Sequence, residues 1–298
     1  MATPWRWMAL STQVHYDAEH KAPMSRREMV RTIALSIAFP MMGLLICYLV
    51  EVLLNVEIPR LASSLINLIF VGFAAFFLFP RVFGIPFGKT EPRELNKRIG
   101  FYIPNFAWRH VLLGATLALC TLSGMLIASM IVGGYELDFG NITLTHLVFS
   151  LNPGIWEEFF YRGVVMVTLL RFTKSLKRAA IIQVVLFGLC HIKGADIQSL
   201  VDIVSVMILG AGFTYAAYKT RTLVAGIVFH YLHDAFLYLV QLPGGVYTGP
   251  MENAVFYAAL WSMTGLGCLI TKIAAERFKV HASTEPYALE GVITARLE

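Results

Sequence analysis

Apolar stretches separated by short polar segments run through most of the chain. A helix needs about 20 apolar residues to cross the hydrocarbon core of a bilayer. Eight stretches approach or reach that length, at residues 33–50, 61–79, 110–132, 144–170, 179–192, 197–218, 222–240 and 254–271. Because helices satisfy their own backbone hydrogen bonds inside a membrane, the pattern predicts an all-α, polytopic transmembrane helix bundle with about eight spans.

The overall composition agrees with a membrane protein. Hydrophobic residues make up 57% of the chain, charged residues only 14%, and the mean hydropathy is +0.66. Soluble domains carry about 25% charged residues, so this chain has too few charges to cover a water-facing surface. The 4 cysteines all lie inside apolar stretches, where we interpret them as small core hydrophobes. The chain is therefore predicted to be an integral, multi-pass membrane protein.

The net charge of +5 could suggest a nucleic-acid partner, but the positions of the basic residues favour membrane lipid instead. With the N-terminus in the cytoplasm, eight spans return the C-terminus to the same side. Of the 24 Lys and Arg residues, all except Arg60, Lys193 and Arg162 then fall on cytoplasmic segments, as the positive-inside rule expects. No nucleic-acid partner is expected. The predicted organisation is a cytoplasmic N-terminal arm at residues 1–28, a transmembrane helical domain at residues 29–275 and a cytoplasmic tail at residues 276–298.

Two prolines and one long loop are expected to interrupt the spans. The second span is predicted to stop at Pro80, and Pro153 to break or kink the fourth. Residues 81–109 form a basic loop that contains Gly, Pro and aromatic residues such as Phe101 and Trp108. That composition is typical of a segment that lies on the membrane surface.

The fourth span holds an unusual group of ionisable residues. Glu157, Glu158 and Arg162 lie within residues 154–163, in a segment otherwise apolar enough to cross a bilayer. Such residues cost about 2.5–3.5 kcal/mol each in the middle of a membrane helix and usually serve a function. Glu158 and Arg162 are four residues apart and can pair, whereas Glu157 lies about 100° around the helix from Glu158. We therefore expect one neutralised carboxylate and one that is free to take a proton.

Two further spans carry polar residues at a spacing of four. They are Phe187 and His191 on the fifth span and His230 and Asp234 on the seventh. At a rise of 1.5 Å per residue, Glu157 and His191 both lie roughly 20 Å from the predicted cytoplasmic end, and His230 and Asp234 roughly 12–18 Å. Polar groups from three helices thus reach one layer of the bundle.

A structural role is the simpler explanation for some of these residues. Glu158 and Arg162 are interpreted as a buried pair that fixes helix geometry. His233 lies on a neighbouring face from Asp234 and is interpreted as a buried or interfacial histidine, and Asp202 as a capping or snorkelling residue. For Glu157, His191, His230 and Asp234 we favour a functional role, because ionisable residues inside a membrane are usually functional.

The three motifs together resemble those of the CPBP family, the CAAX proteases and bacteriocin-processing enzymes, also called ABI. This family includes the Ras-converting CAAX endopeptidases. Its motifs stand here as Glu157-Glu158-x-x-x-Arg162, Phe187-x-x-x-His191 and His230-x-x-x-Asp234. Each motif is weak alone, but the three in this order on hydrophobic helices are specific. The resemblance implies an eight-helix fold with a family-like core at about residues 110–245.

By this resemblance, the protein would be an intramembrane endopeptidase whose cavity opens to the cytoplasm. Glu157 and His191 would activate a water, His230 would donate to the oxyanion, and Glu158, Arg162 and Phe187 would support them. Family members often have Asn at the position of Asp234, which here could help His230 or orient it. No cofactor is certain: a zinc bound by His191, His230 and Glu157 and a metal-free reaction would use the same residues.

Other classes of function use similar residues. A proton-coupled transporter also buries ionisable side chains across helices, although no inverted repeat is evident. A non-proteolytic scaffold or immunity factor on the same fold is the other alternative. For a protease, the partner would be a membrane-associated protein or peptide, either prenylated and CAAX-like or of another kind.

Overall fold

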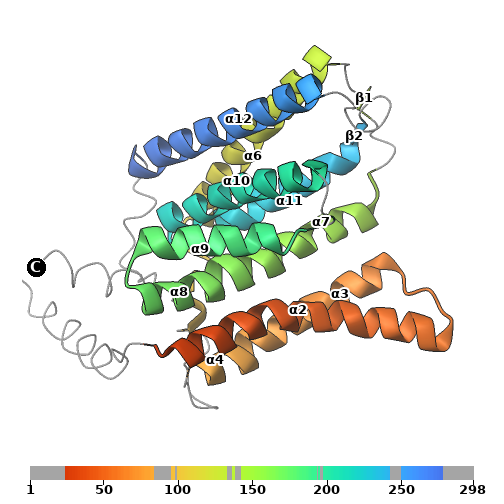
Figure 1. Cartoon of the computed structure of the whole chain (residues 1–298), viewed down its shortest axis with the longest axis vertical. Coiled ribbons are helices and arrows are strands. Elements are labelled where there is room, and N and C mark those ends of the chain that lie inside the picture. Colours follow the sequence, from red (N-terminus) through yellow and green to blue (C-terminus); the bar gives the residue numbers. More distant parts are fainter. Residues whose placement is uncertain are drawn as a thin grey trace, which may run out of the picture.

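Each predicted span forms a helical region in the computed structural model (Figure 1). The structure describes residues 24–83, 95–97, 99–132, 136–137, 142–192, 194, 197–241 and 250–277. The helical segments, with η for π-helix, are α2 (Arg26–Leu54), α3 (Arg60–Phe73), η1 (Ala74–Leu78), α4 (Phe79–Val82), α6 (Ala107–Val132), α7 (Leu144–Glu157), η3 (Glu158–Val165), α8 (Met166–Thr173), α9 (Leu176–Leu189), α10 (Ile197–Thr220), α11 (Val224–Leu239) and α12 (Pro250–Arg277). The strands β1 (Glu136–Leu137) and β2 (Val240–Gln241) form one short antiparallel pair.

The predicted fold class is confirmed, because the described residues form a helical membrane protein. Five helices are long and apolar enough to cross a membrane, at residues 26–54, 60–82, 107–131, 199–220 and 254–277. The count of about eight spans, the cytoplasmic position of both termini and the domain boundaries stay predictions. The N-terminal arm before residue 24 and the tail after residue 277 lie outside the described residues.

Neither proline ends its helix, so the expected stop at Pro80 is wrong, whereas a kink at Pro153 stays a prediction. Pro153 lies inside α7, which continues through η3 and α8 to Thr173. Pro80 lies in the first turn of α4, directly after the π-helical segment η1. Pro80 has no N–H to donate, and it stands in a continuous helix just after the wider π-helical turn of η1. The second helical region therefore runs past Pro80 to Val82.

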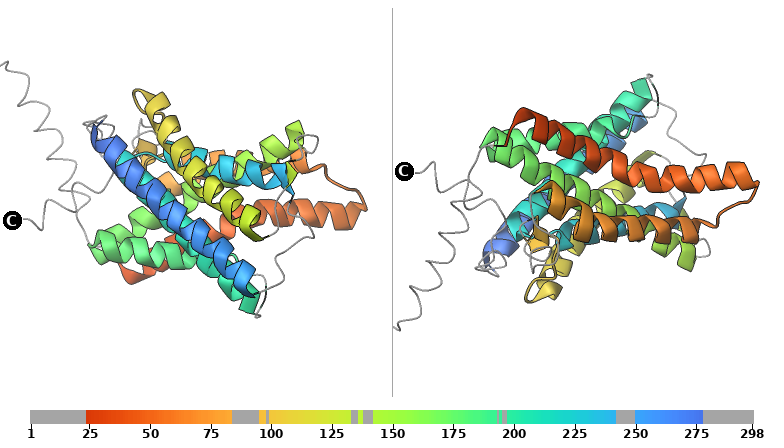
Figure 2. Two further views of the ribbon diagram at one scale, coloured as in Figure 1. Left: turned by 90° about the horizontal axis from the view of Figure 1, so that it is seen from above. Right: turned by 90° about the horizontal axis from the view of Figure 1, so that it is seen from below.

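The helices form three layers, with the long helix α7–η3–α8 in the middle one (Figures 1 and 2). On one side α3 packs against α7, and α2 packs against α3, η3 and α8. On the other side α6 lies along both α11 and α12. α11 also packs against α7, and α9 against both α8 and α10. The middle helix is thus covered from both sides.

The loop at residues 81–109 was expected on the membrane surface, but its described residues are exposed in one part and buried in another. Residues 84–94 and 98 are outside the described residues. Phe106 and Trp108 are exposed, with the Arg109 guanidinium over both rings. In contrast, Ile99 is fully buried and the Phe101 ring lies 5.0 Å from that of Phe159 in the core. The surface assignment is therefore wrong for Phe101, which packs beside the residue that follows Glu158.

Candidate functional site

The three motifs meet in the middle layer. Glu157 ends α7 and is buried, and its Oε2 lies 3.9 Å from Nε2 of His191 and 3.8 Å from Nε2 of His230. Both distances exceed the length of a direct hydrogen bond. Among the described residues, Glu157 Oε2 has no hydrogen-bond partner. A buried carboxylate oxygen without a protein partner thus faces two imidazoles from different helices.

His191 presents a defined ring nitrogen to Glu157. It lies in the turn after α9, two residues beyond Leu189, the last residue of the helix, whereas the predicted fifth span at residues 179–192 included it. Its Nδ1 lies 2.8 Å from the carbonyl oxygen of Phe187. Because a carbonyl only accepts hydrogen bonds, Nδ1 carries the hydrogen. In the neutral imidazole, Nε2 is then an acceptor that faces the Glu157 carboxylate.

His230 lies among three carboxylates. Its Nδ1 is 3.4 Å from Oε1 of Glu158, and its Nε2 is 3.6 Å from Oδ2 of Asp234 and 3.8 Å from Oε2 of Glu157. The ring of Phe213 stacks on the imidazole at 4.6 Å. Gly154 lets α7 approach here, because a Cβ at this position would lie 3.2 Å from the Ile227 carbonyl of α11. The two helices are therefore close enough for His230 to contact both glutamates.

Glu158 and Arg162 form the buried pair that the spacing predicts. The distance between Oε1 and Nη1 is 3.0 Å, and neither side chain is exposed. The Arg162 guanidinium lies over the rings of Phe187 and Phe213, 3.9 Å and 4.9 Å from their centroids, and its Nη2 donates to the carbonyl oxygen of Gly210. The same two phenylalanines contact His191 and His230 respectively. The arginine thus holds both rings against the two histidines.

A π-helical segment begins directly after Glu157 and includes both Glu158 and Arg162. Such wide turns are rare and frequently occur at functional sites. The segment is fully buried from Glu158 to Val165. The sequence predicts a regular helix with 3.6 residues per turn for this span. Because the turns here are wider, the side chains point in other directions than a regular helix would give.

Several contacting residues carry no sequence signal that singles them out. Phe213 and Gly210 lie in the apolar span that forms α10, and Gly226 lies in α11. Thr214 donates both to the Gly210 carbonyl and to Oε1 of Gln183. His233 was interpreted as structural, yet its Nδ1 lies 3.1 Å from Oδ1 of Asp234. The i, i+1 spacing of the last pair hides this contact from a helical-face argument.

Asp202 lies away from this group and pairs with the hydroxyl of Tyr257, which joins α10 to α12. It is therefore no part of the candidate site. The capping or snorkelling role stays a prediction, and the contact adds a link to a side chain of another helix.

The proposed zinc ligands lie farther apart than a zinc site requires. Bonds of 2.0–2.2 Å place the ligand atoms of a tetrahedral zinc roughly 3.3–3.6 Å apart. The distances of 3.8 and 3.9 Å from Glu157 to the two histidines are longer. The described residues contain no group of three or more His, Cys, Asp and Glu side chains that could hold a metal ion. As placed, these residues do not fit a zinc ion.

Replacing Gly226 with Ala is expected to disturb this site. The added Cβ would lie 2.6 Å from Oε2 and 3.3 Å from Cδ of Glu158, a fully buried side chain that Arg162 holds in place. We expect a loss of about 1–3 kcal/mol of stability from overpacking, together with lower activity. Thermal unfolding in detergent measures the first effect.

Gly265→Ala in α12 is the matched control, since nothing lies within 4 Å of its Cβ position. There we expect a neutral or slightly stabilising effect, up to about 1 kcal/mol. Equal unfolding temperatures for the two alanine variants would contradict the close approach of Gly226 to Glu158.

Comparison with known proteins identifies the region that contains all three motifs. Residues 139–236 match the family model described as type II CAAX prenyl endopeptidase Rce1-like. Neither a curated protein nor a solved structure was found to match the chain. The family match confirms the resemblance to CAAX proteases and supports CAAX-type intramembrane protease activity in general. This integral, multi-pass membrane protein therefore contains, in residues 139–236, a region similar to the type II CAAX prenyl endopeptidase Rce1-like family.

Proposed function

We propose that this protein is an intramembrane endopeptidase in which Glu157 and His191 activate a water for attack on a peptide bond. One observation carries the proposal: Glu157 Oε2 and His191 Nε2, both hydrogen-bond acceptors, face each other at 3.9 Å. Two acceptors at this separation need a donor between them. A water supplies one hydrogen to each, which leaves its lone pairs directed toward a substrate carbonyl.

The rest of the reaction follows from the neighbouring groups. As the water oxygen bonds to the carbonyl carbon, Glu157 takes one proton, as a general base does. The electron pair of the C=O bond moves onto its oxygen, which accepts a hydrogen bond from Nε2 of His230. The C–N bond then breaks, and the proton held by Glu157 passes to the leaving amine.

Asp234 is proposed to orient His230 rather than to donate to the oxyanion. Its Oδ2 lies 3.6 Å from Nε2 of His230, and its other oxygen lies 3.1 Å from Nδ1 of His233. An ionised carboxylate only accepts hydrogen bonds, so Asp234 can accept one from His233 and attract the His230 imidazole through its charge, but it cannot stabilise an anion. His233 would then fix the Asp234 carboxylate.

The substrate is proposed to be a membrane-associated protein or peptide, with prenylated CAAX-type peptides as one class. His191 and Asp234 are the accessible members of the site, with side chains 31% and 24% exposed, whereas Glu157 and His230 are below 10%. A peptide would therefore reach the site from the side of His191 and Asp234. The carboxylate and the proposed water would lie behind it.

The test is cleavage of membrane-anchored peptides, with and without a prenyl group, by the purified full chain in liposomes. The products are analysed by mass spectrometry in water enriched in oxygen-18. We expect a single oxygen-18 atom in the new carboxyl terminus and unchanged cleavage after treatment with a zinc chelator.

Loss of cleavage with the chelator and recovery with zinc would overturn the metal-free reaction. Failure to cleave any peptide would overturn the protease assignment in favour of a scaffold. Proton flux through the protein in the same liposomes, without cleavage, would instead favour a transporter.

A further inference from the structure

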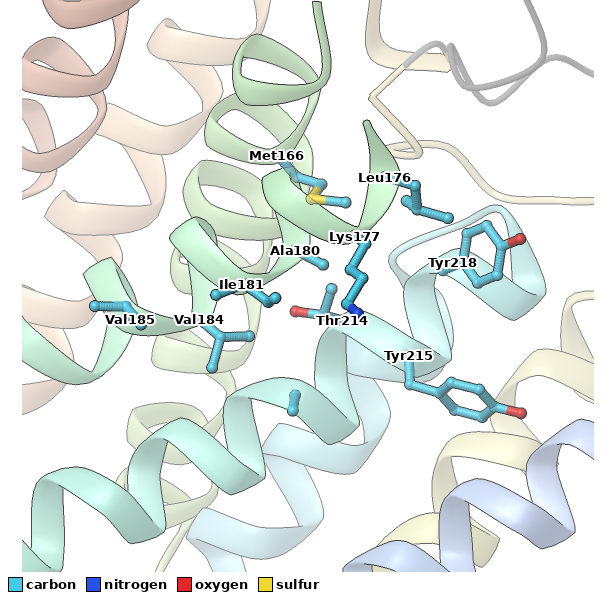
Figure 3. Close-up of a pocket in the computed structure, with 11 residues that line it drawn as sticks. Met166, Leu176, Lys177, Ala180, Ile181, Val184, Val185, Thr214, Tyr215 and Tyr218 are labelled. Carbon is cyan, nitrogen blue, oxygen red and sulfur yellow. The ribbon is translucent and has the colours of Figure 1, made fainter. Parts of the chain in front are cut away.

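A groove separate from the candidate active site lies between α8, α9 and α10 (Figure 3). It has a volume of about 420 Å³ and almost entirely apolar walls. Met166, Ile181, Val185 and Ala211 line it, with Lys177 at one end. This volume falls within the usual range for binding sites of small molecules, about 300–1,000 Å³.

The groove opens toward the side of the bundle where a bilayer would lie. Ile181 and Val185 are 54% and 40% exposed on α9, in a protein with five apolar helices of membrane-spanning length. In a membrane, such a surface faces lipid chains. An extended peptide is a poor occupant, because walls with hardly any polar atoms would leave its backbone groups without partners. Hydrocarbon chains have no such groups.

Lys177 indicates that a molecule bound in the groove would be negatively charged. It is the charged side chain among the lining residues, and the structure gives it no ion pair with any described residue. In Figure 3 its ammonium group projects toward the groove beside Thr214, and the side chains of Tyr215 and Tyr218 lie to one side of it. Lys174, which caps the end of α8, and Arg178, in the first turn of α9, add two basic residues beside Lys177. This end of the groove is complementary to an anion.

We propose that the groove binds an anionic phospholipid, with an acyl chain against α9 and α10 and the phosphate at Lys177. Basic pockets between transmembrane helices commonly hold anionic headgroups on the cytoplasmic side, and the positive-inside pattern predicts that this end is cytoplasmic. Tyrosines near such a boundary suit the headgroup region. A zwitterionic lipid would lack the net charge that complements this end.

The bound lipid would contact helices that support the candidate active site. Thr214 lines the groove and donates to the same Gly210 carbonyl that accepts from Arg162. The groove follows α9, whose last residue lies just before the turn that carries His191. Lipid binding at this site does not require the proposed reaction.

Native mass spectrometry of the full chain released from nanodiscs tests the proposal. The nanodiscs hold equal amounts of phosphatidylglycerol and phosphatidylcholine. We expect the wild type to retain phosphatidylglycerol in preference, and Lys177→Gln to bind it about fivefold more weakly, since one basic residue near the surface contributes on the order of that factor. Ala211→Phe should fill the groove and remove the bound lipid.

Two matched variants serve as controls. Lys272→Gln removes an exposed lysine from α12, and Val204→Phe enlarges an exposed apolar residue of α10 that does not line the groove. Both should retain phosphatidylglycerol as the wild type does. Equal retention of the two lipids, or the same loss in Lys272→Gln as in Lys177→Gln, would overturn the proposal. If Val204→Phe lost lipid as Ala211→Phe does, the groove would not be the site.

Discussion

Glu157→Gln is expected to lower the rate of peptide cleavage by about 10²–10⁴-fold, the usual contribution of a general base. The amide has nearly the same shape as the carboxylate but cannot take the proton of the attacking water. It also replaces an acceptor by an NH₂ group on one side, which would disturb the water between Glu157 and His191, 3.9 Å apart. The rate is measured with the membrane-anchored peptides described above.

The control for this variant is Glu276→Gln, which removes a carboxylate that also faces a cation. Glu276 is 53% exposed and lies 3.9 Å from Lys219, so its loss is expected to change neither activity nor folding. Unfolding temperatures of both variants separate loss of chemistry from loss of structure. Cleavage by a folded Glu157→Gln protein within a few fold of the wild type would contradict the role of Glu157 as general base.

The features that depend on local helix geometry could be predicted from the sequence alone. Four-residue spacing places Glu158 near Arg162 and His230 near Asp234, whatever the rest of the fold does. The depth of each residue along its span also follows from helix rise, and it predicts that Glu157, His191 and His230 share a layer. Hydropathy predicts the helices, because each span has to satisfy its backbone within the membrane.

The features that the sequence does not predict depend on how helices rotate and approach one another. Phe213 stacks on His230 only because α10 and α11 pack with those faces together. Gly226 contacts Glu158 for the same reason, and nothing in its neighbourhood in the sequence distinguishes it from other glycines. The π-helical turn after Glu157 changes the side-chain directions that a regular helix would give. Phe101 enters the core although its segment has a surface-like composition.

Arg162→Met is expected to destabilise the protein by about 3–5 kcal/mol, because it leaves Glu158 as an unpaired charge inside the bundle. Arg162 and Glu158 are both fully buried and 3.0 Å apart. The methionine would keep an apolar contact with Phe187 but lose the guanidinium group, which lies 3.9 Å from the centroid of that ring. Unfolding in detergent with increasing denaturant measures the change in the free energy of unfolding.

The double variant Glu158→Met/Arg162→Met tests the cause of that loss. Replacing both members of a buried pair with apolar residues is often neutral or stabilising, so we expect it to recover much of the stability. Activity should stay low, because Glu158 Oε1 lies 3.4 Å from Nδ1 of His230 and would no longer position that imidazole. A double variant as unstable as Arg162→Met would show that the loss comes from the contacts of Arg162 with Phe187, Phe213 and Gly210. Recovery of both stability and activity would instead mean that the pair only fills space and that His230 does not depend on Glu158.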